Sequence, residues 1–257
     1  MSALPSPFAQ PLPSAVAAAV WRGSDICQAA GPVVGSGWDA LDRELPGGGW
    51  PCGCLSEVLS PQAAVLEWRL LGPALRQVVA EGGSVLLVGP PKPPYLPGLQ
   101  HFGIEARHLV WVQAETPAER LWATEQLLQA DAAGAILAWL PQARPEQLRR
   151  LQSHAQDGRA LLFALRPENA RMESSPAALR VLARFGLDWT LQIQVLKRRG
   201  PIHAETLSLP SVPGGLESVL SSRVRTPSRL SSPSSGAAHA LGRVATPLSS
   251  RCPAPAP

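Results

Sequence analysis

The sequence predicts an α/β fold built on a mostly parallel sheet with helices on both faces. Three observations support this. Apolar runs without polar alternation recur along the chain, as in strands that are buried on both faces. These runs alternate with longer segments typical of helices, which indicates a parallel sheet joined by crossover helices. After residue 188 apolar and polar residues alternate with period two, which predicts an antiparallel hairpin at the sheet edge.

The expected elements follow one another from residue 54 onward. The apolar runs predict strands at 54–59, 84–88, 108–112, 135–140 and 160–165. The intervening segments predict helices at 62–81, near 99, 116–131 and 144–155. Gly82-Gly83 ends the first long helix, and Pro117 stands in the first turn of a later one. The hairpin is expected at 189–195 and 204–209.

The composition predicts one domain with two tails. Residues 1–14 are rich in proline and are expected to be disordered, whereas 15–213 form the domain, with its core at about 33–210 and a short helix at 15–27. Residues 214–257 are rich in Ser, Pro, Arg and Ala and contain no aromatic residue, so a disordered basic tail is expected. Neither a secretory leader nor an apolar run long enough for a membrane span is present, which favours a cytoplasmic protein without membrane contact.

The charge is unevenly distributed between the domain and the tail. Residues 1–213 carry 18 Lys+Arg and 18 Asp+Glu, whereas residues 214–257 carry five Arg and one Glu. A neutral body argues against a broad phosphate-binding face, because nonspecific nucleic-acid binding depends on cations. The four cysteines lack the spacing of a zinc set and are expected to be reduced, structural thiols.

Three phrases between residues 33 and 210 resemble the RecA recombinase core. They are the glycine-rich lead-in Gly35–Gly53, the phrase Phe102–Val112, and the helix and strand of Ala118–Leu140. The resemblance implies a RecA-like sheet and a phosphate loop of the form Gly-x-x-x-x-Gly-Lys-Ser/Thr after the first core strand. It also implies that Arg166–Pro176 occupies the place of a mobile loop that contacts DNA.

The residues that would bind nucleotide are missing at the positions where that family carries them. Ser60–Glu67 reads Ser-Pro-Gln-Ala-Ala-Val-Leu-Glu, without glycine or lysine, and Glu67 would repel a phosphate. Trp139 stands near the place of the aspartate that would help to hold magnesium, and the loop after strand 84–88 offers only Lys92. We therefore expect a degenerate phosphate loop, no cofactor and no ATPase activity.

A narrower resemblance rests on one phrase. Leu45–Leu55 reads Leu-Pro-Gly-Gly-Gly-Trp-Pro-Cys-Gly-Cys-Leu and is similar to the lead-in of the ImuA proteins of bacterial SOS mutagenesis; the length and the basic tail also fit. This resemblance implies a non-catalytic accessory of error-prone translesion synthesis that is induced by DNA damage. The implied partners are an ImuB-like Y-family-type protein, an alternative replicative-type polymerase and RecA, with direct or indirect contact to DNA left open.

Two other functions stay open at this point. The related SulA proteins inhibit cell division, and a SulA-like chain would bind a tubulin-like division protein. An ATPase with an unrecognised phosphate loop is the second alternative.

Two groups of cations are candidates for contacting a partner or DNA. The first is at the expected hairpin tip and the second in the tail: Lys197, Arg198 and Arg199, then Arg223, Arg225 and Arg229. A solvated turn and a solubilising tail are the alternatives. A structural role is expected for the loop formed by Gly47, Gly48, Gly49, Trp50 and Pro51, because three consecutive glycines allow unusual dihedral angles.

Overall fold

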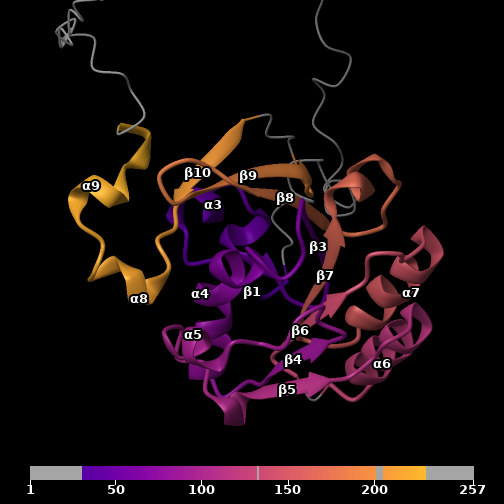
Figure 1. The fold of residues 1–257 in the computed structure, drawn as a ribbon. Coiled ribbons are helices and arrows are strands. Elements are labelled where there is room, and N and C mark those ends of the chain that lie inside the picture. The colour runs from indigo at the N-terminus through magenta and orange to yellow at the C-terminus, as the bar shows by residue number, and fades with distance from the viewer. Residues whose placement is uncertain (1–30, 132, 201–204, 230–257) are drawn as a thin grey trace, which may run out of the picture.

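A mostly parallel sheet of eight strands forms the centre of the protein. The computed structural model describes residues 31–131, 133–200 and 205–229, and Figure 1 shows the sheet, whose strand order is β10-β9-β8-β3-β7-β6-β4-β5. Its strands are β3 (Leu55–Ser60), β4 (Val85–Val88), β5 (Leu109–Val112), β6 (Ala135–Trp139), β7 (Leu161–Pro167), β8 (Leu179–Phe185), β9 (Thr190–Lys197) and β10 (Thr206–Pro210). Strands β3 to β8 are parallel, and β9 and β10 form the antiparallel edge hairpin. The predicted α/β class with a mostly parallel sheet is therefore confirmed.

Helices cover both faces of this sheet. The longer ones are α4 (Glu67–Ala80), α6 (Pro117–Gln129) and α7 (Pro145–Ala155); the shorter ones are α3 (Asp39–Asp42), α5 (Leu96–Gln100), α8 (Gly214–Glu217) and α9 (Ser222–Arg225). Short 3-10 turns lie at η1 (Pro46–Gly48), η2 (Ala106–His108), η3 (Glu168–Met172) and η4 (Pro227–Arg229). Figure 1 shows α4 on one side of the sheet and α6 and α7 on the other. None of the helices among the described residues is long and apolar enough to cross a membrane.

Alternate residues of the buried strands pack into two different cores. In β6, Leu137 and Trp139 belong to the cluster under α4, whereas Ile136 and Ala138 belong to the cluster under α6 and α7. All five residues of β6 are buried. This is why the strand reads as a continuous apolar run in the sequence.

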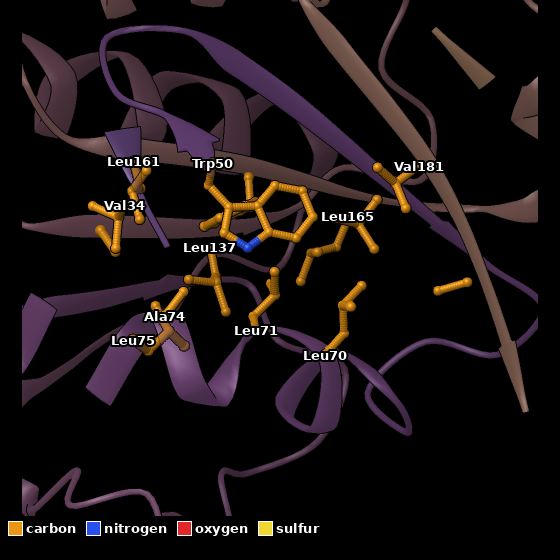
Figure 2. Packing of buried hydrophobic residues seen from close by; sticks show 14 of the residues in the cluster. Val34, Trp50, Leu70, Leu71, Ala74, Leu75, Leu137, Leu161, Leu165 and Val181 are labelled. Atoms are coloured by element: carbon orange, nitrogen blue, oxygen red, sulfur yellow. The ribbon is translucent and has the colours of Figure 1, made fainter. Parts of the chain in front are cut away.

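The glycine-rich loop places a tryptophan in the first core. Trp50 is fully buried and meets the ring of Phe163 edge to face, with 5.2 Å between ring centroids; Figure 2 shows its indole among the leucines of α4 and the sheet. Trp50–Pro51 forms the short strand β2, which pairs with β1 (Val33–Val34). A Cβ on Gly49 would lie 2.4 Å from the carbonyl oxygen of Val34, so only glycine fits the close approach of the two chains.

The structure differs from the sequence prediction at several elements. Helix α4 begins at Glu67 and not at residue 62, because residues 61–66 form a loop in which Ala64 has a φ of 58°. Strand β8 was not predicted. Residues 214–229, expected to be disordered, contain α8, α9 and η4. Residues 1–30, with the expected helix at 15–27, and residues 230–257 lie outside the described residues, as do residues 201–204 of the hairpin.

Candidate functional site

The junction between β3 and α4 lies at the carboxyl edge of the parallel strands, where open α/β sheets bind their ligands. Here the side chain of Glu67 turns back into the loop that precedes it. Its carboxylate accepts hydrogen bonds from the backbone N–H groups of Ala64 (2.8 Å), Val65 (2.8 Å) and Leu66 (3.1 Å). Glu67 is 1% exposed, so these bonds are shielded from water.

Three amides that converge on one anion form a concave site of the kind that binds phosphate in many proteins. In this chain the anion is the protein's own carboxylate. From the sequence we expected Glu67 to repel phosphate. In the structure its carboxylate also accepts the hydrogen bonds that these three N–H groups would otherwise donate to another anion. The acidic residue at the start of a helix was the available sequence signal.

A hollow of about 200 Å³ lies beside this loop. Its walls are the prolines of the loop after β4, together with Trp68, Tyr95 and Trp139, and Lys92 is the cation among the residues that line it. Trp139 is 3% exposed, and its indole nitrogen has no hydrogen-bond partner among the described residues. The bulky indole therefore occupies the end of β6, as the sequence suggested. Among the described residues, no group of three His, Cys, Asp or Glu side chains could hold a metal ion.

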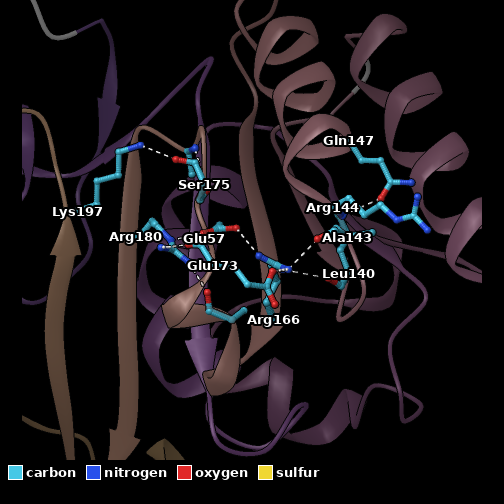
Figure 3. Close-up of polar contacts among 12 residues, drawn as sticks. Glu57, Leu140, Ala143, Arg144, Gln147, Arg166, Glu173, Ser175, Arg180 and Lys197 are labelled. Atoms are coloured by element: carbon cyan, nitrogen blue, oxygen red, sulfur yellow. Dashed lines mark hydrogen bonds and ion pairs between the residues drawn. The ribbon is translucent and has the colours of Figure 1, made fainter.

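A buried ionic cluster ties the loop after β7 to the sheet. Glu57 of β3 pairs with Arg166 of β7 (3.0 Å) and with Arg180 of β8, and Figure 3 shows the glutamate between the two arginines. Arg180 also donates to the carbonyl of Ala170 (2.8 Å), and Arg166 pairs with Glu173 (2.7 Å). The segment that resembles a mobile DNA-contacting loop is thus held by internal contacts, and the guanidinium of Arg166, 1% exposed, is unavailable to DNA.

The three cations predicted at the hairpin tip have three different surroundings. Lys197 donates to the carbonyl of Ser175 (2.7 Å), and partial burial, followed by the nearby charge of Arg180, lowers its pKa. Arg198 pairs with Glu44 (2.9 Å) in a half-buried contact. Arg199 is exposed. Lys197 and Arg198 are thus engaged in contacts within the protein.

Arg199 lines a second hollow, of about 560 Å³, at the amino ends of the parallel strands. Arg159 and the free thiols of Cys52 and Cys54 line it as well. Burial, and then the neighbouring Cys54 and Glu81, raise the pKa of Cys52. This thiol is therefore largely protonated and a poor nucleophile at neutral pH.

The tail cations that the structure describes lie in short helices. Arg223 and Arg225 belong to α9, and Arg229 ends η4. Arg225 donates to the carbonyls of Glu217 and Leu220, so it holds α8 and α9 together. Arg223 is exposed.

The fold and the junction define a class of protein. It is an α/β domain with a mostly parallel sheet, in which the Glu67 carboxylate binds the backbone amides of the loop between β3 and α4. No family model matches the sequence.

The sequence is similar to proteins described as cell division inhibitor SulA. The relative from Photorhabdus laumondii is 31% identical over 112 residues, which is 44% of this chain and 63% of the relative. The relative from Pectobacterium atrosepticum is 29% identical over 119 residues, and the one from Serratia marcescens is 27% identical over 116 residues. These matches cover 46% and 45% of this chain and 71% and 69% of the relatives. The chain thus spans less than two thirds of the Photorhabdus relative.

Proposed function

We propose that this chain is a RecA-like protein without ATPase activity that acts by binding a partner protein. The observation that carries the proposal is the carboxylate of Glu67 on the amides of residues 64–66. In an active RecA-like protein, the loop after the first core strand would present such amides to a nucleotide phosphate. A tethered anion competes with the phosphate for these donors and repels its charge.

Further support for a silent site comes from the neighbouring hollow. Trp139 fills the end of β6, where a magnesium-binding aspartate would stand in an active relative. Lys92 is the cation that lines the hollow, but it belongs to an exposed loop. A flexible lysine without a phosphate cradle is a weak substitute for the missing motif.

Nucleotide binding tests this part of the proposal. Purified protein should give no heat of binding in calorimetry with ATP and Mg²⁺ up to about 1 mM. The variant Lys92→Ala should behave in the same way. Tight binding that depends on magnesium, and that Lys92→Ala weakens, would overturn the proposal, and release of phosphate from ATP would then establish the alternative ATPase function.

For the partner, the comparisons favour a cell-division protein. All three relatives are named as inhibitors of cell division, and the similarity covers 44–46% of this chain. The proposed activity is therefore inhibition of division by binding a tubulin-like division protein. Overexpression in a bacterial host should then produce filamentous cells, whereas normal division at the same protein level would count against this partner.

A second candidate is the ImuA-like role in translesion synthesis. It is favoured by the phrase Leu45–Leu55, by the length of the chain and by the arginines after residue 213. The partners would be an ImuB-like protein and an error-prone polymerase, in cells with damaged DNA. Recovery of these proteins with the tagged chain from damaged cells, together with normal division on overexpression, would favour this candidate over the first.

A further inference from the structure

Two free thiols line the hollow of about 560 Å³ at the amino ends of the parallel strands. They belong to Cys52 and Cys54, which are both partly exposed and are separated by Gly53. The proposed function uses neither thiol. The cysteines lack the spacing of a zinc set, but two thiols that line one hollow can bind a metal ion that needs fewer ligands.

The backbone fixes the turn that carries the two thiols. The N–H of Cys52 donates to the carbonyl of Pro32 (2.9 Å), and the N–H of Gly53 donates to the carbonyl of Ala160 (3.1 Å). Gly53 has a φ of 61°, and a Cβ at this position would lie 2.7 Å from the carbonyl oxygen of Gly158. Glycine is therefore required between the two cysteines. A fixed turn holds both ligands in place before an ion binds, which reduces the entropy that binding costs.

The donors that line the hollow select an ion with a low coordination number. Among the described residues in its wall, Cys52 and Cys54 supply sulfur, and no His, Asp or Glu side chain is present. Glu81 lies near Cys52 but outside this wall, and its carboxylate accepts a hydrogen bond from Gln77 (3.0 Å). Structural zinc takes four ligands, whereas Cu(I) is stable with two thiolates. The pair of thiols therefore suits Cu(I).

We propose that Cys52 and Cys54 form a two-coordinate binding site for Cu(I). When the ion binds, each thiol releases its proton to the solvent, and each sulfur forms a bond to copper as a thiolate. Copper stays in the Cu(I) state, so binding needs no oxidant or reductant. Two thiolates and one monovalent ion together carry a single negative charge.

The charges that line the hollow favour a monovalent ion. Arg159 and Arg199 are exposed cations in its wall, and their positive charges attract the anionic copper–thiolate group. A divalent ion with the same two thiolates would form a neutral group and would gain less from the arginines. This inference does not depend on the proposed function.

Competition with bicinchoninate, a chelator that forms a coloured complex with Cu(I), tests the site in the reduced full-length chain without oxygen. The wild-type chain should take up one equivalent of Cu(I) from the chelator. Cys52→Ser and Cys54→Ser should each lower the affinity by about 100-fold or more, because a hydroxyl oxygen is a poor ligand for a soft ion. The double variant Cys27→Ser/Cys252→Ser removes the two other cysteines of the sequence and is the matched control. It should bind Cu(I) like the wild type.

Three results of this titration would overturn the proposal. They are a wild-type chain that takes no Cu(I) from the chelator, unchanged affinity in Cys52→Ser or Cys54→Ser, and loss of binding in the control variant. Thermal unfolding checks that each variant is folded.

X-ray absorption at the copper edge gives a readout that needs no variant. The wild-type chain loaded with one equivalent of Cu(I) should show two sulfur neighbours around copper. A third sulfur neighbour, or a nitrogen neighbour, would refute the two-coordinate site.

Removal of the two arginines tests the effect of charge. The double variant Arg159→Ala/Arg199→Ala should bind Cu(I) about three- to tenfold more weakly than the wild type. Arg171→Ala is the matched control, since Arg171 is exposed on η3 at the opposite edge of the sheet, and it should leave the affinity unchanged. Equal affinity in both variants would refute the placement of the two arginines at the copper site.

Discussion

Replacement of Glu67 by alanine measures how much the internal anion contributes to the fold. The change leaves the amides of residues 64–66 without their acceptor at a position that is 1% exposed in the wild type. A hydrogen bond to a charged group contributes about 1.5 to 3 kcal/mol. Water can enter the vacated space and satisfy some of the amides, so the three bonds do not add fully. We expect Glu67→Ala to lower the free energy of unfolding by about 3 kcal/mol.

Urea unfolding followed by circular dichroism measures this loss, and the melting temperature should fall by about 6 to 12 °C for a domain of this size. Glu119→Ala is the matched control. Glu119 also accepts backbone hydrogen bonds at a helix start, from the N–H groups of Glu115 (2.9 Å) and Thr116 (3.1 Å), but it is exposed. Its removal should destabilise the protein less. Equal losses for the two variants would refute the idea that the Glu67 carboxylate is an integral ligand of its loop.

Three further predictions concern other parts of the structure. Glu57→Ala removes the buried carboxylate that Arg166 and Arg180 share, although Arg166 keeps its pair with Glu173, and should lower the free energy of unfolding by about 3 kcal/mol, measured in urea. Gly49→Ala forces a Cβ against the carbonyl of Val34 and should destabilise the protein by about 2 kcal/mol, with a fall in melting temperature as the readout. The hydrogen bond from Arg184 lowers the pKa of Glu168, so the stabilisation from this pair is present above the unfolded carboxyl pKa and is lost as the pH falls through the folded value. Glu168→Gln should therefore make stability less sensitive to acid between about pH 5 and pH 3, and an unchanged pH profile would contradict this assignment.

The sheet was predictable where burial on both faces produced apolar runs, as in β6. Strand β8 was missed because Arg180 and Arg184 interrupt its apolar residues, and charged residues are ordinarily exposed. The burial of Arg180 depends on Glu57, which lies 123 residues earlier in the chain. A pairing over that distance leaves no local pattern in the sequence.

The sequence predicts that Ser60–Glu67 lacks the residues of a phosphate loop, but it does not predict that the Glu67 carboxylate binds the amides of this loop. The sequence shows that Ser60–Glu67 contains no glycine or lysine, but the path of the Glu67 side chain depends on the left-handed turn at Ala64. The different contacts of the three neighbouring cations were unpredictable for a related reason. Lys197, Arg198 and Arg199 leave the end of a strand, where successive side chains point in opposite directions, so neighbours in the sequence contact different parts of the fold.

A ligand that belongs to the chain differs from a diffusing ligand in one further respect. The Glu67 carboxylate reaches the amides of residues 64–66 when the chain folds. Because it is part of the chain, its concentration at this site does not vary with the metabolic state of the cell. In many proteins that bind ATP and ADP, the nucleotide that is bound determines when the protein assembles with a partner and when it is released. In the proposed function, a tethered carboxylate replaces the exchanging nucleotide, so no such timing step is expected at this edge of the sheet. We expect the timing of any activity to be set by how much of the protein is made and how fast it is removed.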